Sequence, residues 1–388
     1  MKRSTVMICT LLLFVSCAWV AAQEITIGVD FSITGPSASL GVPDQNAIVL
    51  APHVLGGQKV RYVFLDDASD PATAVQNVKR LISQDNIDVL IGPSVTPTTI
   101  GAIETVAAAK VPMLTAGSTS RLVLPMDAQK KWVFKMPPND DIFCTAMINE
   151  MARKGVKTLG MIVVNDPFGE SWTSITTQQA ATKGIKVIDV EKFNRDDSSA
   201  TAQALHAMSA HPDAMLIAAV GTAAVTPSKA LYQIGYKGLV FQAGGAVNAD
   251  FLRVGGAAVE GMYSPSPPVI VSEQLPDGYP TKNTGVAFRK LYESKYGPGT
   301  VSHYAGHAWD ATLWLDAAIP FAIKKGKPGT VEFREALRDA LENDIHNLVG
   351  VQAVFNMTPE NHNGVDQRGM VMVQVVNGAW KLVSYPNY

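Results

Sequence analysis

Apolar and polar positions follow two periodicities along the first part of the chain, one typical of strands and one typical of helices. Short runs rich in β-branched residues predict buried strands, and the segments between them carry the apolar spacing of helices. The helix expected at 71–84 has Asp70 as its N-cap and Pro71 in its first turn. The expected elements are strands at 25–31, 60–67, 87–92 and 111–117 and helices at 71–84 and 98–110. This alternation predicts a doubly wound parallel sheet.

The alternation of predicted strands and helices is interrupted at 135–141, where two prolines are followed by an asparagine and two aspartates. It then resumes. The second set of elements comprises strands at 158–166, 185–193, 214–221 and 239–245 and helices at 170–184, 200–212 and 227–238. The sequence therefore predicts a second α/β lobe of similar build.

A second proline-rich break at 263–270 precedes three long segments of helical periodicity, which we expect to return to the first lobe. These helices are expected at 285–297, 302–326 and 330–344. The C-terminal part alternates like antiparallel strands, with Asn377 and Gly378 as a hairpin turn. We expect an α/β fold of two doubly wound parallel-sheet lobes joined by a multi-crossover hinge, which allows closure around a ligand. The expected ranges are 23–138 and 265–349 for lobe I, and 139–264 and 350–388 for lobe II.

Residues 1–22 have the pattern of a cleaved export signal. Lys2 and Arg3 form a basic start, an apolar run follows at 6–15, and small residues precede a cut ahead of Gln23. The apolar run is too short to span a bilayer, and no later segment is long and uncharged enough to do so. We therefore expect a periplasmic protein, with an N-terminal anchor helix as an alternative.

Cysteine usage agrees with export. Cys9 and Cys17 lie in the signal, so Cys144 is the single cysteine of the mature chain and cannot form an internal bridge. A lipid tether at Cys17 is a second alternative to a free periplasmic protein. Cys144 lies at helical spacing within 140–152, which favours a buried structural thiol over a nucleophile.

Length, composition and charge exclude some classes of partner. The chain has 388 residues, with 47% apolar and 17% charged residues, which fits a globular protein of two domains. The formal net charge of −2 produces no field that would attract nucleic acid or an anionic membrane surface. We expect no nucleic-acid partner.

Hydroxyl side chains gather at two neighbouring strand ends, in the loops 92–99 and 115–120. Ligands of open parallel sheets bind beyond the carboxyl ends of strands, and hydroxyls with free N–H groups at a helix N-terminus suit a carboxylate. Helix capping alone is the alternative interpretation. Phosphate is less favoured, because the loops lack a phosphate-binding pattern and only Lys110 and Arg121 are near.

Catalytic and metal-binding arrangements are hard to find. The chain has no nucleophile-elbow pattern, no zinc-protease pattern and no paired-cysteine spacing. His303 and His307 stand four apart with Asp310 beyond, but the segment reads as the core face of a helix rather than a metal site. The glycine-rich segment 242–248 does not match a dinucleotide fingerprint. We expect no enzyme, no cofactor and no metal.

Five segments stand out by their order and spacing: "ITIGVDFSITGPSASLG", "FLDDASDPATAVQNVKRLI", "VLIGPSVTPTT", "VPMLTAGSTS" and "VVNDPFGES". Together they resemble the leucine/isoleucine/valine-binding proteins, the periplasmic receptors of branched-chain amino-acid ABC transporters. The resemblance covers nearly the whole mature chain.

The resemblance implies two α/β lobes with three crossovers and a ligand held at the hinge. In such proteins a hydroxyl of the first loop and backbone and hydroxyl groups of the second hold the ligand carboxylate. The positions that this places in the site are Leu40, Thr96, Gly117, Ser118, Thr119, Phe168 and Gly244.

Departures from the family pattern bear on the ligand. The acidic residue that pairs with the ligand ammonium in amino-acid binders falls on Gly244, and a nearby aromatic position falls on Val220 or Gly221. The positions of the family's disulfide read Ser69 and Val95. A buried ammonium without a countercharge costs several kcal/mol. We therefore expect a small carboxylic acid with an apolar or aromatic body and no amine, as in the branch that takes up aromatic carboxylates.

The expected function is that of an extracytoplasmic solute-binding receptor of an ABC uptake transporter, which binds a small carboxylate between the two lobes and delivers it to the permease. An amino-acid receptor is the alternative, and a ligand-sensing protein is less favoured because neither a membrane span nor a DNA-binding module precedes Tyr388. The expected partners are a small carboxylate and the permease subunits of an ABC transporter, and the expected state is a monomer.

Overall fold

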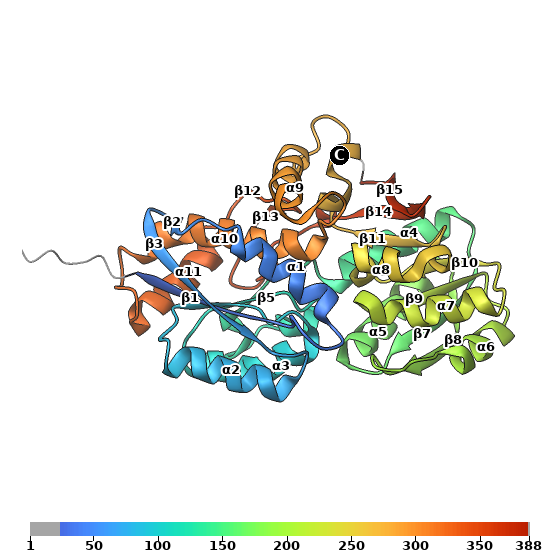
Figure 1. Ribbon diagram of the computed structural model, residues 1–388, viewed down its shortest axis with the longest axis horizontal. Helices are drawn as coiled ribbons and strands as arrows, with labels where there is room; N and C mark the ends of the chain where they lie inside the picture. The colour runs from blue at the N-terminus through green and yellow to red at the C-terminus, as the bar shows by residue number, and fades with distance from the viewer. Residues whose placement is uncertain (1–23, 387–388) are drawn as a thin grey trace, which may run out of the picture.

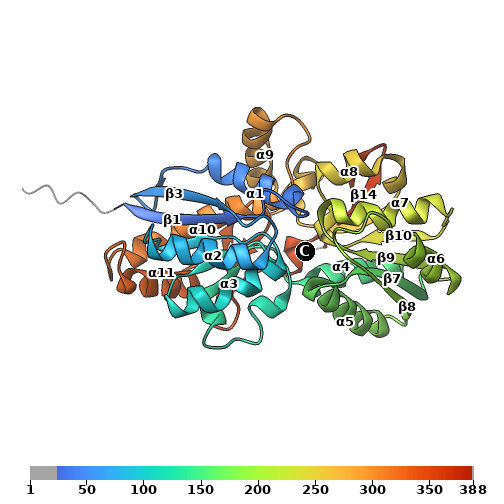
Figure 2. The same ribbon diagram turned by 60° about the horizontal axis from the view of Figure 1, so that its bottom comes forward.

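Two β-sheets organise the chain, and each forms the centre of one lobe (Figure 1). The computed structural model describes residues 24–386, so the predicted export signal at 1–22 and Cys17 lie outside the described residues. The two lobes lie side by side along the long axis of the molecule, and helix α9 lies over the region between them in both views (Figure 2).

The first lobe contains, among the described residues, a six-stranded sheet in the order β2-β3-β1-β4-β5-β6. All neighbouring strands are parallel except the pair β2 and β3. The central strand β1 is buried along its whole length, as expected for a parallel strand covered on both faces. The strands are β1 (Ile25–Phe31), β2 (Val54–Leu55), β3 (Gln58–Asp66), β4 (Val89–Ile91), β5 (Met113–Thr115) and β6 (Val133–Lys135).

Five helices pack on this sheet within the described part of the chain. Helices α2 and α3 pack against each other, and α10 packs between α1 and α11. Figure 1 shows the two groups on opposite faces of the sheet. Their bounds are α1 (Ala38–Val49), α2 (Pro71–Ser83), α3 (Thr96–Ala108), α10 (His303–Ala322) and α11 (Val331–Asn343).

The second lobe contains a described seven-stranded sheet in the order β15-β14-β11-β10-β9-β7-β8. Its strands are β7 (Thr158–Val164), β8 (Lys186–Phe193), β9 (Ala214–Ala218), β10 (Leu239–Gln242), β11 (Tyr263–Ser266), β14 (Val371–Val376) and β15 (Ala379–Ser384). Helix α4 packs on α5, and α7 packs on α6 and α8. These helices are α4 (Asp140–Arg153), α5 (Pro167–Thr182), α6 (Thr201–Ser209), α7 (Val225–Gln233) and α8 (Ala249–Gly255).

The chain passes between the two sheets three times. It leaves the first sheet after β6, returns after β11 to form α10 and α11, and re-enters the second sheet at β14. Helix α9 (Lys282–Tyr296) and the two-stranded sheet of β12 (Leu348–Val349) and β13 (Val354–Phe355) lie on the later connections. The predicted fold class, two α/β lobes joined by several crossovers, is confirmed, with antiparallel strands added at the sheet edges.

Local signals in the sequence account for most element boundaries. Asp70 caps α2 by accepting a hydrogen bond of 2.7 Å from the Thr73 N–H, as predicted. Asn377 and Gly378 both have positive φ and form the predicted turn between β14 and β15. Helix α5 begins before the expected residue 170, because Asp166 caps it by accepting from two backbone N–H groups.

The structure contains elements that were not predicted. Helix α1 is one of them, and it includes Gly41 and Pro43. The segment 263–270, predicted as a break, contains β11, which pairs with β14 along its length despite Pro265. A proline removes one ladder donor, and the remaining backbone groups of this strand keep their antiparallel partner.

No helix among the described residues is long and apolar enough to cross a membrane.

Candidate functional site

A cavity lies between the two lobes and is lined by both of them. Its volume is about 440 Å³, which includes space open to solvent. The lining residues are Leu40, Ser94, Val95, Thr96, Ala116, Ser118, Pro137, Phe143, Phe168, Trp172, Arg195, Val220, Gly245, His303, Tyr304 and His307.

The first hydroxyl-rich loop follows β4 and is held close to β1. Gly92 has a φ of 115°, and a Cβ atom there would lie 2.0 Å from the Asp30 carbonyl oxygen. Only glycine fits this turn. The Ser94 hydroxyl accepts from the Ser32 N–H at 3.2 Å and donates to Asp44 at 3.0 Å, so it ties the loop to the core.

Thr96 is the hydroxyl of this loop that stays without a partner. The Thr98 and Thr99 hydroxyls donate to the Val95 carbonyl oxygen at 3.0 and 2.9 Å, so both are bonded within α3 and neither caps its free N–H groups. Thr96 is 2% exposed, and its Oγ1 atom is buried without a hydrogen-bond partner at the edge of the cavity. Val95, the N-cap of α3, provides no side-chain cap, so the helix N-terminus remains available to an anion.

The second loop contributes Ser118 to the cavity but not Gly117 or Thr119. The Gly117 N–H donates to the Thr115 hydroxyl at 3.0 Å. The Thr119 hydroxyl donates to Ser171 of the second lobe at 2.8 Å, which is a contact between the lobes. The Ser118 carbonyl oxygen accepts from Lys135 at 3.0 Å, and burial lowers the pKa of that lysine to about 7.

Aromatic side chains form most of the second-lobe side. The predicted Phe168 lines the cavity, and its ring centroid lies 5.7 Å from that of Trp172. Phe143 adds a third ring, 6.2 Å from Trp172. Leu40, also predicted, lines the cavity from α1 of the first lobe. The indole Nε1 of the buried Trp172 has no hydrogen-bond partner among the described residues.

Gly244 does not line the cavity, although its neighbour Gly245 does. A Cβ atom on Gly244 would lie 2.2 Å from the ring of Phe143. The ring therefore fills the space that an acidic side chain would need. Val220 lines the cavity as expected, whereas Gly221 packs against α1, where a Cβ atom would lie 2.3 Å from the Ser39 hydroxyl.

His303 and His307 line the cavity as part of a hydrogen-bonded chain rather than as free ligands. His303 Nε2 lies 2.9 Å from the Gly244 carbonyl oxygen, and His303 Nδ1 lies 3.1 Å from His307 Nε2. His307 Nδ1 contacts the amide of Gln352. All four ring nitrogens are thus occupied. Burial lowers the pKa of His303 to about 4 and that of His307 well below its usual value, so both rings are neutral.

Arg195 was not predicted. It lies two residues beyond the end of β8 and lines the cavity from the second lobe. The rule that ligands meet the carboxyl ends of parallel strands, applied to β8, would have found it. Arg121, which the sequence analysis considered, does not line the cavity; it is exposed and lies 4.0 Å from Glu170.

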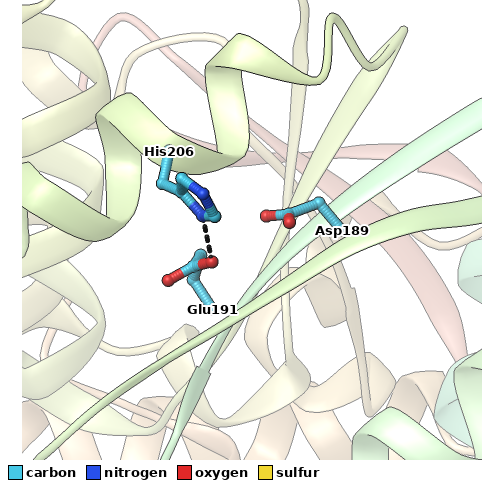
Figure 3. A group of neighbouring side chains, drawn as sticks. All are labelled: Asp189, Glu191 and His206. Carbon is cyan, nitrogen blue, oxygen red and sulfur yellow. Dashed lines mark hydrogen bonds and ion pairs between the residues drawn. The ribbon is translucent and has the colours of Figure 1, made fainter.

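The predicted thiol of Cys144 and a carboxylate–histidine cluster that was not predicted lie away from the cavity lining. Cys144 is buried and free, as predicted, and burial raises the pKa of its thiol. Asp189 and Glu191 on β8 and His206 on α6 place ligand atoms within 4.8 Å of one another (Figure 3). Glu191 contacts His206 at 2.5 Å and raises its pKa, which describes an ion pair at the outer edge of the second sheet.

Two α/β lobes, three crossovers and an enclosed cavity between the lobes define a bilobal binding protein of the type I periplasmic class. Residues 24–379 match the model of the periplasmic binding protein family, and the chain belongs to that family.

Known relatives agree with this assignment. An extracellular ligand-binding receptor of Rhodopseudomonas palustris HaA2 is 38% identical, with a TM-score of 0.89 over 93% of this chain and 100% of that chain. An ABC transporter solute-binding protein of R. palustris, solved with benzoate, shares the fold at 19% identity, with a TM-score of 0.76 over 94% of this chain and 96% of that chain.

A curated relative matches a shorter part. An amino acid binding protein of Pseudomonas aeruginosa is 27% identical over 187 residues, which are 46% of this chain and 49% of that protein. The chain thus matches about half the length of this relative.

Proposed function

We propose that this protein is the extracytoplasmic solute-binding receptor of an ABC uptake transporter and that its ligand is a small carboxylic acid without an amine. The Thr96 hydroxyl carries the proposal. It is buried without a partner beside an uncapped helix N-terminus, and a buried unpaired hydroxyl is costly unless a ligand completes it. A carboxylate would accept from this hydroxyl and from the free N–H groups of α3.

The walls of the cavity indicate the body of the ligand. Phe143, Phe168 and Trp172 line the cavity together with Leu40 and Val220. A flat aromatic ring or a short apolar chain would bury its surface against these side chains. The ligand class is therefore an aromatic or apolar organic acid.

The two-lobed architecture supports a receptor rather than an enzyme. The first lobe would capture the carboxylate, the second would close over it, and the closed form would be presented to membrane permease subunits. Export by the signal at 1–22 would place the protein in the periplasm, where it would act as a monomer without a cofactor.

An amino-acid ligand is the second candidate, because one relative is named an amino acid binding protein. An amino acid brings an ammonium group that needs an acidic partner. Among the described residues that line the cavity, none is acidic, and Phe143 fills the space beside Gly244. The carboxylic acid without an amine is thus the better-supported ligand.

Thermal-shift titration of the purified mature protein tests the proposal, with benzoate, phenylacetate, leucine and valine as probes. We expect the two acids to raise the unfolding temperature and the two amino acids to leave it unchanged. Thr96→Ala should weaken binding of the acids about tenfold, the value of one hydrogen bond to a charged group. Thr105→Ala, a control on the same helix outside the cavity lining, should bind like the wild type. Stabilisation by leucine or valine alone would reject the proposed ligand class.

A further inference from the structure

Arg195 is the one fully charged side chain among the described residues that line the cavity. No aspartate, glutamate or lysine lines it, and His303 and His307 are neutral because they are buried. Asp44 lies behind Ser94 rather than at the surface of the cavity, and burial raises its pKa well above the usual value. The one formal charge at the cavity lining is therefore that of the guanidinium, whose partner Asp166 lies outside the lining.

The position of Arg195 brings that charge close to the start of α3. Arg195 borders the cavity and also an outer groove that contains Val95 and Pro97. These two residues flank Thr96, whose hydroxyl lacks a partner. A cation of the second lobe and an open helix N-terminus of the first lobe thus approach the same end of the cavity, and both favour an anion.

Asp166 holds the guanidinium in place. Nε and Nη2 of Arg195 each lie 2.6 Å from Asp166 Oδ2. The other oxygen, Oδ1, accepts from the Phe168 and Gly169 N–H groups at 2.9 and 3.1 Å and caps α5. Within the described chain, no hydrogen bond from Nη1 of Arg195 occurs, so the guanidinium retains donors for a ligand. Such a preorganised cation loses little freedom when it binds.

We infer that Arg195 determines the charge specificity of the site: it binds the ligand carboxylate from the second lobe, opposite Thr96, and it disfavours ligands that carry an ammonium. This inference rests on the proposed function, since it concerns the same ligand. The carboxylate then joins the two lobes, because it accepts from Thr96 and α3 on one side and from Arg195 on the other. An α-amino acid would place its ammonium in the same cavity with no acidic partner.

Calorimetric titration with an acid and its neutral amide separates this role from a structural one. The full mature protein and its variants are titrated with benzoate, benzamide and leucine. Arg195→Gln should weaken benzoate binding about 30-fold and leave benzamide binding unchanged, so the preference for the acid falls by the same factor. Arg195→Lys, which keeps the charge without the planar fork, should recover part of that loss. Arg121→Ala, at an exposed arginine outside the cavity lining, should retain the wild-type preference.

The outcomes distinguish the inference from the proposed function. Equal losses for benzoate and benzamide in Arg195→Gln would assign Arg195 a structural role and overturn the inference alone. An unchanged preference for benzoate in that variant would do the same. A wild type that binds leucine but not benzoate would overturn the proposed function and this inference together. Thermal unfolding without ligand confirms that each variant is folded, and Arg195→Lys keeps the test valid if Arg195→Gln does not fold.

Discussion

The two sides of the cavity are built from different chemistry. The first-lobe side presents hydroxyls on two loops, and most of them bond within the lobe, as Ser94 and Thr99 do. The second-lobe side presents aromatic rings and one arginine, with no acidic residue among the described residues of the lining. Under the proposed function, the first side would bind the carboxylate with neutral groups, and the second side would select the body and the charge of the ligand.

This contrast also explains why a family resemblance identifies the first side more completely than the second. The carboxylate is common to amino acids and to simple acids, so one loop design serves both. The ammonium is not shared; the resemblance places the residue that would bind it at Gly244, where a Cβ atom would lie 2.2 Å from the Phe143 ring.

Gly92→Ala should produce the largest effect, on the first-lobe side. The added Cβ would lie 2.0 Å from the Asp30 carbonyl oxygen, and the φ of 115° is unfavourable for alanine. We expect the free energy of unfolding to fall by at least about 3 kcal/mol. Chemical denaturation measures this loss. Gly57→Ala is the control: its φ is also positive, but no atom lies within 4 Å of the new Cβ, so its cost should be about 1 kcal/mol. Equal losses would show that strain at Gly92 does not shape the loop.

Asp30→Asn, at a buried position of β1 in the first lobe, should change how the free energy of unfolding depends on pH. Burial and the neighbouring Asp67 raise the pKa of Asp30 to about 8, whereas the unfolded chain has the ordinary value near 3.8. Between these values the native state keeps a proton that the unfolded state releases, so stability falls as pH rises. The slope is at most about 1.4 kcal/mol per pH unit, or roughly 2 kcal/mol from pH 6 to 7.5.

Denaturation at several pH values tests this expectation. Asp30→Asn should remove the contribution of Asp30 to this pH dependence and raise the free energy of unfolding near the upper end of the range from pH 6 to 7.5. Asp344→Asn, at an exposed position of the first lobe, should leave the slope unchanged. An unaltered slope in Asp30→Asn would mean that Asp30 is ionised in the native protein.

Ser171→Ala should have a smaller effect, on the contact between the two sides. The Ser171 hydroxyl accepts from Thr119 across the cleft and donates to Asp140. Its loss should weaken the closed arrangement by about 1 kcal/mol and reduce ligand affinity about fivefold. Calorimetry with benzoate and small-angle scattering of the unliganded protein measure the two quantities. Thr119→Ala should give a similar loss, and the double variant little more, because both remove one contact. Additive losses would contradict a shared contact between the lobes.

The sequence allowed the fold and part of the site to be predicted. Periodicity and capping signals such as Asp70 located most strands and helices, and the family resemblance placed Leu40, Thr96, Ser118 and Phe168, which line the cavity. These residues lie in continuous motifs at strand ends or helix starts. The ranges predicted for the two lobes remain a prediction, as do the ligand and the absence of a metal.

The remaining site residues could not be predicted from local patterns. Phe143, Trp172 and His307 reach the cavity from the first two turns of helices, where they have the same apolar spacing as core residues. Gly117 and Thr119 were placed in the site by resemblance, but their polar groups are bonded to Thr115 and Ser171. Which hydroxyl lacks a hydrogen-bond partner depends on contacts between segments that are far apart in the sequence, so it cannot be read from one segment.

A crystal structure of the mature protein with benzoate tests the central claim most directly. We predict that the carboxylate lies within hydrogen-bond distance of the Thr96 hydroxyl and of the Arg195 guanidinium, with the ring between Phe143, Phe168 and Trp172. A carboxylate bound away from both Thr96 and Arg195, or a co-purified α-amino acid that occupies the cavity in its place, would contradict the account.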